Sequence, residues 1–296
     1  MKVVVGASSF SDSSDKAINR LLEKGIEVVK NPYKRKMTEE EIIEHLSGAD
    51  GLLAGLEPLN ESVFKQSPQL KAIARIGIGM DNVDIRAAEK YGIRVSNTPD
   101  GPTEAVAEMT LAALLTLSHQ FILSNDDIHN GIWKKRMGKS IREMIVLVIG
   151  YGHIGKRVTE QLRGMGAKVM IYDKYNMDAS DCSLEEGLRI ADVITLHANG
   201  IDEILGVHQL AMLKRDAIIL NSARGQLVNE DALFQALQEE RIGGYWGDAL
   251  WQEPYSGKIT TCKNALLTPH ICTYTKECRE SMEIQAVENL LGDLGF

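Results

Sequence analysis

Three polar side chains in the second half of the chain have types and positions that could do acid–base chemistry on an anion. Arg224 directly follows the apolar run AIILNSA, Glu253 follows GYWGDAL, and His270 ends ALLTPH. The planar fork of an arginine can grip a carboxylate. A histidine held by a carboxylate can keep a proton and act as a general acid. Taken singly, a loop arginine or glutamate is usually solvated surface, and a histidine beside a proline is more often structural.

A glycine-rich turn precedes these residues in the segment VLVIGYGHIGKRV (146–158). Gly150 can form the turn, Gly152 can let a phosphate approach the backbone, and Gly155 can let the following helix pack closely on the strand. The first amides of that helix would then face the pyrophosphate of a dinucleotide. The alternative is a tight turn between a strand and a helix that binds no nucleotide.

A carboxylate further along the chain favours the dinucleotide interpretation. Asp173 ends the next strand, roughly 20 residues on, where a carboxylate binds the ribose 2′-hydroxyl and repels a 2′-phosphate. The order of strand, glycine turn, helix and Asp173 predicts a site selective for NAD over NADP. Lys174, next to Asp173, weakens that preference slightly. Inside the turn, His153 is interpreted as a spacer or a phosphate neighbour, and Ile154 is assigned to the same cofactor site.

Parallel strands are needed to position these residues, and short β-branched runs alternate with amphipathic stretches along the chain. Strands are expected at 3–7, 26–30, 49–55, 70–77 and 93–97, and then at 144–150, 167–173, 191–197, 217–223, 244–250 and 265–270. Helices are expected at 15–25, 38–48 and 84–92, over the long apolar stretch 103–123, and at 275–291. This alternation predicts an α/β protein with two doubly wound parallel sheets, whose ligand sites lie at the carboxyl ends of the strands. The last helix could cross back to pack on the first domain.

The composition excludes several classes of function. Of 296 residues, 44% are hydrophobic and 25% are charged, and the formal net charge is −8. We expect no nucleic-acid or membrane partner, because the basic surface that binds either is missing. The N-terminus becomes polar too soon for a signal peptide, and no apolar run approaches the ~20 residues of a membrane span. The four cysteines form no CxxC pair, so we expect reduced thiols, no metal site and a cytoplasmic protein.

Several separated motifs resemble one enzyme family. NSARGQLVNEDAL (221–233), GDALWQEP (247–254) and LLTPHI (266–271), downstream of GYGHIG, are similar to the signature motifs of the D-isomer-specific 2-hydroxyacid dehydrogenases. RIGIGMDNVD (75–84) and NTPDGPTEAVAEMTLAALL (97–115) extend the resemblance over most of the chain. It implies NAD-dependent hydride transfer between the nicotinamide and C2 of a 2-oxo acid.

The resemblance also implies a domain arrangement and an assembly. It predicts a Rossmann NAD-binding domain at 98–273 and a flavodoxin-like substrate domain formed by both chain ends, 1–97 and 274–296. It further implies a homodimer, with the long helix after Pro102 as an interface element. An apolar helix buried within one subunit would look the same in the sequence.

The resemblance implies a role for each candidate residue. His270 would protonate the carbonyl oxygen during reduction, Glu253 would hydrogen-bond His270, and Arg224 would bind the substrate carboxylate and carbonyl oxygens. Asp248 would contact the nicotinamide carboxamide. The other expected cofactor neighbours are His197, Ala198 and Ala223.

RIGIGMDNVD is the most informative stretch for the substrate. Backbone amides of Ile78 and Gly79 can bind the substrate carboxylate, with Asn82 close by. The stretch is similar to the phosphoglycerate dehydrogenase branch, in which an arginine precedes the Gly-x-Gly; Arg75 stands there and could hold a phosphate. The alternative is that Arg75 pairs with a local carboxylate. We expect the pair D-3-phosphoglycerate and 3-phosphohydroxypyruvate first, and plain acids such as glyoxylate or hydroxypyruvate second.

Some features depart from the family or leave other functions open. HANG (197–200) replaces the usual proline and threonine, and Cys272 to Tyr274 follow His270 where small residues are usual. The chain stops at Phe296, which suggests a short form without a regulatory domain. Glu253 argues against formate as donor, because formate enzymes of this superfamily have Gln there; phosphite stays open. A corepressor-like protein that senses NAD(H) without turnover is the rival from another class.

Overall fold

The protein is described by a computed structural model that covers residues 1–296. The chain divides into two compact units, of which unit 1 consists of Met1–Pro102 with Thr273–Phe296, and unit 2 of Thr103–Cys272. The boundaries expected after residues 97 and 273 are shifted in the structure to follow Pro102 and Cys272.

Unit 1 contains a five-stranded parallel sheet in the order β2-β1-β3-β4-β5, which is the flavodoxin-like order. Its strands are β1 (Lys2–Val5), β2 (Glu27–Val29), β3 (Gly51–Ala54), β4 (Ala72–Arg75) and β5 (Arg94–Asn97). Its helices are α1 (Lys16–Glu23), α2 (Glu39–His45), α3 (Glu61–Gln66), α4 (Ile85–Lys90) and α11 (Lys276–Leu294).

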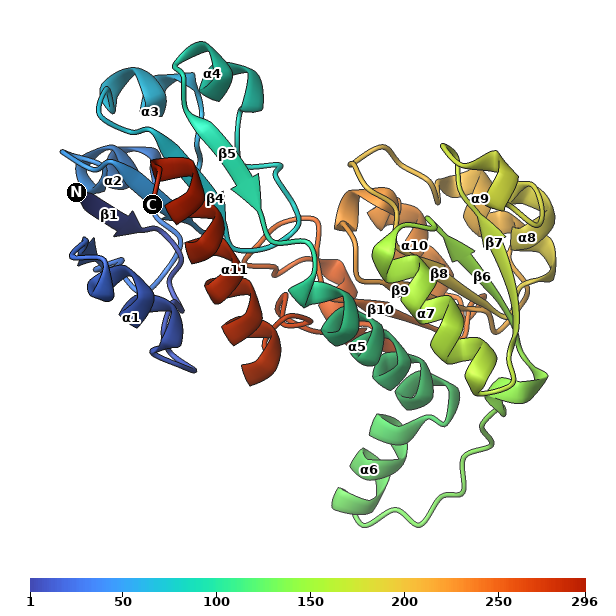
Figure 1. Cartoon of the computed structure of the whole chain (residues 1–296). Helices are drawn as coiled ribbons and strands as arrows, with labels where there is room; N and C mark the ends of the chain where they lie inside the picture. The colour runs from blue at the N-terminus through green and yellow to red at the C-terminus, as the bar shows by residue number, and fades with distance from the viewer. The chain divides into compact units, whose positions relative to one another are not determined.

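Helices cover both faces of this sheet (Figure 1). On one face, Leu52 and Ile73 pack against Ile42 of α2 and Phe64 of α3. On the other, α11 contacts α1, β3, β4 and β5. The predicted return of the last helix to the first domain is therefore confirmed.

Unit 2 contains a six-stranded parallel sheet in the order β11-β10-β9-β8-β6-β7. Its strands are β6 (Ile145–Ile149), β7 (Lys168–Tyr172), β8 (Val193–Leu196), β9 (Ile218–Asn221), β10 (Gly244–Gly247) and β11 (Ala265–Leu267). The helices are α5 (Gly101–Ser118), α6 (Phe121–His129), α7 (His153–Gly164), α8 (Leu184–Ile190), α9 (Val207–Met212) and α10 (Glu230–Gln238). Single 3-10 turns are η1 (Ile141–Glu143), η2 (Met177–Ala179), η3 (Gly225–Leu227) and η4 (Lys258–Thr261).

The residues of β6 show how this sheet is buried on both faces. Val146 packs in the core that includes α5 and α7, whereas Leu147 and Ile149 pack in the core that includes α8 and α10. Strands buried on both faces are apolar throughout, as here. The strand order reverses between β6 and β8, and doubly wound sheets bind ligands at the carboxyl ends of the strands at this point.

The single long helix predicted over 103–123 is wrong, because the structure has two helices, α5 and α6, with a bend of 58° between them. Gln120 lies at the break with a φ of 51°, and an α-helix cannot continue through a left-handed residue. No single helix is long and apolar enough to cross a membrane. The bent pair α5–α6 reaches the required length and composition only when its two helices are taken together.

Candidate active site

Two glycines of the turn after β6 are required by packing inside unit 2. Gly150 has a φ of 93°, and a Cβ on it would lie 2.6 Å from the backbone nitrogen of Ala198. A Cβ on Gly155 would lie 2.0 Å from the Gly150 oxygen. These glycines therefore bring the end of β6, the end of β8 and the first turn of α7 into close contact.

Gly152 differs, because a Cβ on it would meet no atom within 4 Å. It is the N-cap of α7, whose first amides have no partner within the helix. His153 is exposed there, whereas Ile154 packs partly against the core. The open space beside free helix amides suits a phosphate group.

Asp173 follows β7 and is joined to the same turn. Its Oδ2 accepts a hydrogen bond from the Tyr151 nitrogen at 2.7 Å, and its Oδ1 accepts from Tyr175 and Asn176 nitrogens at 2.9 and 3.0 Å. Partial burial acts to raise the pKa of Asp173, but the three amide donors outweigh it and hold the pKa below its usual value. Asp173 therefore remains an anion beside the glycine turn.

His197 links the ends of β8 and β9. Its Nε2 lies 2.8 Å from Thr195 Oγ1 and its Nδ1 lies 3.2 Å from Ser222 Oγ, while its backbone nitrogen donates to Ile149 O at 2.8 Å. Burial lowers the pKa of His197 to about 3, so the ring is neutral at ordinary pH. The backbone of Ala198 lies against Gly150.

His270 and Glu253 form a contact between the loops after β11 and β10. The Nδ1 of His270 lies 3.0 and 3.1 Å from the two carboxylate oxygens of Glu253. Burial acts to raise the pKa of Glu253, but the hydrogen bond and charge of His270 outweigh this and lower it. Nδ1 is thus engaged with an ionised carboxylate, and Nε2 is the nitrogen that is left to exchange a proton with a ligand.

Arg224 lies in the loop after β9, whose backbone is held by a buried amide. Asn221, fully buried, donates from Nδ2 to Arg224 O at 2.8 Å and accepts from the Ala223 nitrogen at 3.1 Å. Arg224 Nη1 donates to Ala223 O at 2.7 Å. A Cβ on Gly225 would lie 2.4 Å from the backbone of Leu250, so this loop packs directly on the one after β10.

Asp248 has a structural role that the sequence did not predict. Its carboxylate is 1% exposed, with Oδ1 accepting from Thr268 Oγ1 at 2.6 Å and Ile271 nitrogen at 2.9 Å, and Oδ2 from Cys272 nitrogen at 3.0 Å. These bonds fix the segment around His270, whose φ of 54° is left-handed. The expected contact of Asp248 with the nicotinamide stays a prediction.

In unit 1, the loop after β4 contains the residues expected to bind substrate. Asn97 Nδ2 donates to Ile78 O at 2.8 Å, while the backbone amides of Ile78 and Gly79 donate no hydrogen bond to other backbone groups of the chain. Asn82 Nδ2 donates to Gly55 O and Glu57 O at 3.2 and 2.7 Å, so its amide serves the loop itself. Arg75 Nη1 donates to Ile76 O.

Comparison with known proteins agrees with this geometry. Residues 111–272 match the model of the NAD binding domain of the D-isomer specific 2-hydroxyacid dehydrogenases. The chain belongs to this family. A glyoxylate reductase of Thermococcus kodakarensis is 30% identical, over 91% of this chain and 89% of that protein. A D-3-phosphoglycerate dehydrogenase of Synechocystis is 31% identical, over 90% of this chain and 51% of that protein.

The fold of this chain is also found in solved structures. A crystal structure of a Thermus thermophilus protein superposes with a TM-score of 0.91 and 33% identity, over 99% of this chain and 97% of that one. The cofactor of the family domain is NAD, and unit 2 has features that suit it. They are the open space at Gly152, the first amides of α7 and the anionic Asp173.

The sequence analysis missed two residues that position the candidate site. Asn221 holds the Arg224 loop, and Thr268 joins Asp248 to Trp246 Nε1, which donates to Thr268 Oγ1 at 3.0 Å. Both are polar residues at the ends of apolar strand runs, and this signal could have found them. The four cysteines are free, burial raises the pKa of Cys272, and no group of three His, Cys, Asp or Glu side chains could hold a metal.

Proposed function

We propose that this dehydrogenase interconverts a 2-oxo acid and a D-2-hydroxy acid, with His270, Glu253 and Arg224 as its catalytic residues. The observation that supports this most directly is the contact of His270 Nδ1 with the carboxylate of Glu253. It leaves Nε2 available, and a histidine positioned in this way is a general acid–base catalyst.

Each of the three residues has a distinct part in the proposed reaction. Arg224 binds the carboxylate of the acid with its planar guanidinium. His270 donates a proton from Nε2 to the carbonyl oxygen during reduction and takes it back during oxidation. Glu253 is an anion that holds the ring through Nδ1 and stabilises its protonated form.

The residues that would hold the cofactor come from the loops after β6, β7 and β8. The amides at the start of α7 would bind the pyrophosphate, and Asp173 would bind the adenosine ribose. When bound, NADH supplies the hydride for C2 of the acid. We also propose that His153, His197, Ala198, Ala223 and Asp248 border the cofactor.

For the substrate, we propose a plain 2-oxo acid such as glyoxylate or hydroxypyruvate. The glyoxylate reductase relative supports this choice, and the Ile78 and Gly79 amides are suited to a single carboxylate. The phosphorylated acid expected first from the sequence remains the second candidate, because a D-3-phosphoglycerate dehydrogenase is equally similar and Arg75 stands in the same loop.

The catalytic assignment is tested with His270→Asn, which keeps a side chain of similar polarity but removes the proton donor. We expect the kcat for reduction to fall by about 10²–10⁴-fold, the usual contribution of a general acid, while NADH binding measured by fluorescence is retained. His208→Asn, an exposed histidine of α9, is the matched control. An unchanged rate in His270→Asn would contradict the assignment.

A substrate panel tests the activity itself. Initial rates of NADH oxidation are measured with glyoxylate, hydroxypyruvate, pyruvate and 3-phosphohydroxypyruvate, and repeated with NADPH. We expect turnover of the plain acids and a preference for NADH, because Asp173 would repel a 2′-phosphate. Tight NADH binding without turnover of any acid would instead favour the corepressor-like function.

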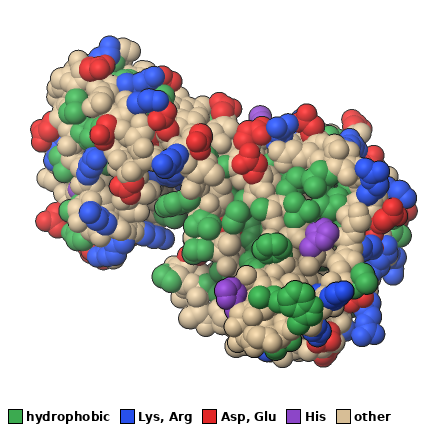
Figure 2. Space-filling view, turned by 90° about the horizontal axis from the view of Figure 1, so that it is seen from below, with side chains coloured by type: hydrophobic (Ala, Val, Ile, Leu, Met, Phe, Trp, Pro, Cys, Tyr) green, Lys and Arg blue, Asp and Glu red, His purple; other side chains and the backbone are tan.

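We further propose that two copies associate through α6 and the loop after it. Exposed apolar side chains are concentrated there, namely Phe121, Ile128, Ile132, Trp133 and Met137, and Figure 2 shows hydrophobic side chains gathered on this side of unit 2. Contiguous exposed apolar surface of this kind marks interaction sites.

The backbone beneath this surface is well anchored. Arg136 forms two hydrogen bonds with the Asp127 carboxylate, at 2.8 and 3.1 Å, and the Ile132 nitrogen donates to Asp127 O at 2.8 Å. The loop therefore presents its apolar side chains in a fixed arrangement, which lowers the entropy cost of binding a second copy.

A further inference from the structure

The loops after β9 and β10 of unit 2 contain the proposed catalytic residues Arg224 and Glu253. They are in contact at Gly225, where a Cβ would lie 2.4 Å from both the Leu250 carbonyl carbon and the Trp251 nitrogen. Only glycine allows this approach, because the nearest atoms belong to the backbone and cannot rotate away. The backbone next to Arg224 therefore lies directly against the backbone two residues before Glu253.

Two side-chain hydrogen bonds hold this contact from opposite directions. The indole Nε1 of Trp251 donates to Val228 O at 2.8 Å, and Gln226 Nε2 donates to Trp251 O at 3.0 Å. Val228 is 1% exposed, and a buried carbonyl that loses its donor destabilises the fold. Trp251 therefore holds the loop after β9 through its side chain and is held by that loop through its backbone.

The indole ring is itself fixed by two tyrosine rings. Its centroid lies 5.9 Å from that of Tyr245 and 5.8 Å from that of Tyr255, within the range of favourable aromatic pairs. Tyr245 is fully buried in β10, and the Tyr255 hydroxyl donates to Glu230 Oε1 at 2.7 Å. Glu230 begins α10, which follows the Arg224 loop, so Tyr255 adds a third connection between the two loops.

The loop after β10 also leads to the proposed proton donor. The Leu250 nitrogen donates to Glu253 Oε1 at 3.4 Å, and the Glu253 carboxylate contacts His270 Nδ1 at 3.0 and 3.1 Å. A continuous series of contacts thus runs from the backbone of Arg224, through the loop that contains Trp251, to the ring of His270. Every member of this series lies in unit 2.

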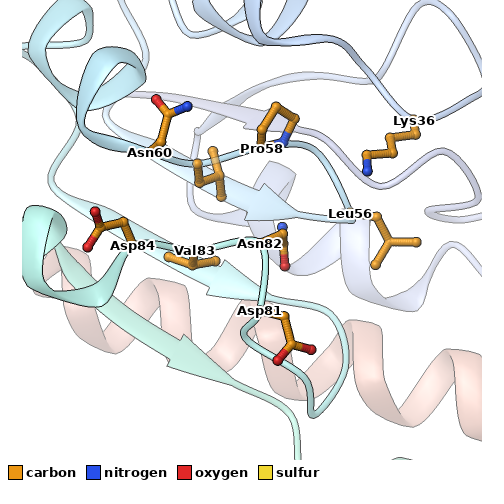
Figure 3. Close-up of a pocket in the computed structure, with 9 residues that line it drawn as sticks. Lys36, Leu56, Pro58, Asn60, Asp81, Asn82, Val83 and Asp84 are labelled. Carbon is orange, nitrogen blue, oxygen red and sulfur yellow. The ribbon is translucent and has the colours of Figure 1, made fainter. Parts of the chain in front are cut away.

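In unit 1, the groove beside Asn82 offers little attraction to an anion. It has a volume of about 490 Å³, and its charged residues are one cation, Lys36, and two carboxylates, Asp81 and Asp84 (Figure 3). A carboxylate gains little from such surroundings. The proposed function therefore relies on Arg224 for positive charge, and the position of its loop becomes important.

We propose that Trp251 is a positioning residue that sets the spacing between Arg224 and the proton donor His270. The inference rests on the proposed function and deepens it. In a 2-oxo acid the carboxylate and the carbonyl group are on adjacent carbons, so the anion-binding group and the proton donor must act at a fixed separation. The ring of Trp251 does not touch the acid; its N–H keeps the two loops together, so that both groups meet the acid at once.

Trp251→Phe tests this, because it removes the indole N–H and keeps an aromatic ring between the two tyrosines. The measurement is a single turnover of NADH bound to excess enzyme, started with saturating glyoxylate or hydroxypyruvate. We expect the rate constant to fall by on the order of tenfold or more, since a small misplacement of reacting groups is costly, while the amplitude and the NADH Kd stay unchanged. A purely structural role would instead lower the amplitude, because less enzyme would be folded, and would leave the rate constant unchanged.

Two glutamine variants provide a milder test and its control. Gln226→Met removes only the bond to Trp251 O and should lower the rate constant by a smaller factor. Gln66→Met removes an equivalent bond, from an exposed glutamine to Ser62 O at 3.4 Å in α3, and should leave the rate constant unchanged. A wild-type rate constant in Trp251→Phe would overturn the proposal, as would an equal loss in Gln66→Met.

Hydrogen exchange of the cofactor-free protein keeps the test independent of turnover. In Trp251→Phe the amides of residues 222–229 and 248–253 should exchange faster than in the wild type, whereas those of α7 should not. Unchanged exchange in both loops would contradict the connection. If the wild type reduced no acid while the loops showed this response, the proposed function would fail and the connection made by Trp251 would stand.

Discussion

At the scale of single residues, unit 2 contains two histidines with opposite surroundings. The His270 side chain is 39% exposed and contacts the Glu253 carboxylate, which stabilises the charged ring. The ring of His197 lies between the hydroxyl groups of Thr195 and Ser222, and burial lowers its pKa to about 3. Only His270 combines an exposed ring with a carboxylate partner, which suits a residue that exchanges protons with a ligand, whereas the hydrogen bonds of His197 suit a structural role.

The partly buried His197 predicts how stability depends on pH. The unfolded chain binds a proton at His197 near pH 6.5, whereas the folded protein does not until about pH 3. Between these values the unfolded state holds more protons, so the free energy of unfolding falls as the pH falls. The slope from this one group is about 1 kcal/mol per pH unit near pH 5.

Urea unfolding of the cofactor-free protein at pH 7 and pH 5 measures this effect. His197→Asn, which can keep hydrogen bonds to Thr195 and Ser222, should lose less stability between the two pH values than the wild type. His208→Asn removes an exposed histidine and should behave as the wild type does. Equal pH dependence in wild type and His197→Asn would show that the ring can be protonated in the folded state.

At the scale of elements, the glycines of the turn between β6 and α7 have two different roles, one in packing and one in binding. Gly150 and Gly155 are required because a Cβ on either would strike backbone atoms. At Gly152 nothing in the protein opposes a Cβ, and its φ of −77° suits any residue. Packing within the chain therefore does not require glycine at position 152, and a ligand that occupies the space beside it would.

Gly152→Ala should therefore leave folding intact and weaken cofactor binding. We expect a Tm close to that of the wild type and an NADH Kd raised by on the order of tenfold, because the Cβ would enter the place of the phosphate. Gly164→Ala, near the other end of α7 and also free of neighbours, should raise stability by about 0.5–1 kcal/mol without changing the Kd. Unchanged NADH affinity in Gly152→Ala would place the pyrophosphate elsewhere.

At the scale of the whole molecule, the exposed apolar surface on α6 and the loop after it predicts self-association. Trp133 and Met137 are 86% and 89% exposed, and charges introduced there would be buried in a dimer without partners. We expect the wild type to sediment with twice the chain mass of 32.7 kDa. Trp133→Glu combined with Met137→Glu should sediment as a monomer.

An exposed apolar residue of another helix provides the control for this experiment. Val207 of α9 is 69% exposed, and Val207→Glu should leave the sedimentation unchanged. A wild-type monomer, or a dimer that both variants preserve, would contradict an interface on α6.

Much of this protein follows from local sequence. Alternating β-branched and amphipathic runs determine the two parallel sheets, because each strand must bury both of its faces. The glycine turn, Asp173, and the strand-end positions of Arg224, Glu253 and His270 follow from the rule that ligand sites lie at carboxyl ends. The order of these motifs was enough to identify the family.

Other features depended on contacts between distant parts of the chain. The bend at Gln120 has no glycine or proline in the sequence to indicate it, although the backbone there is left-handed. The buried hydrogen bonds of Asp248 join it to Thr268, Ile271 and Cys272, which lie at and after the end of a later strand. The full burial of the Glu57 carboxylate could not be predicted from its place in a polar loop, because it depends on the packing around the ends of β1 and β3. Hydrogen bonding and burial are properties of three-dimensional neighbours, and only the tertiary structure determines them.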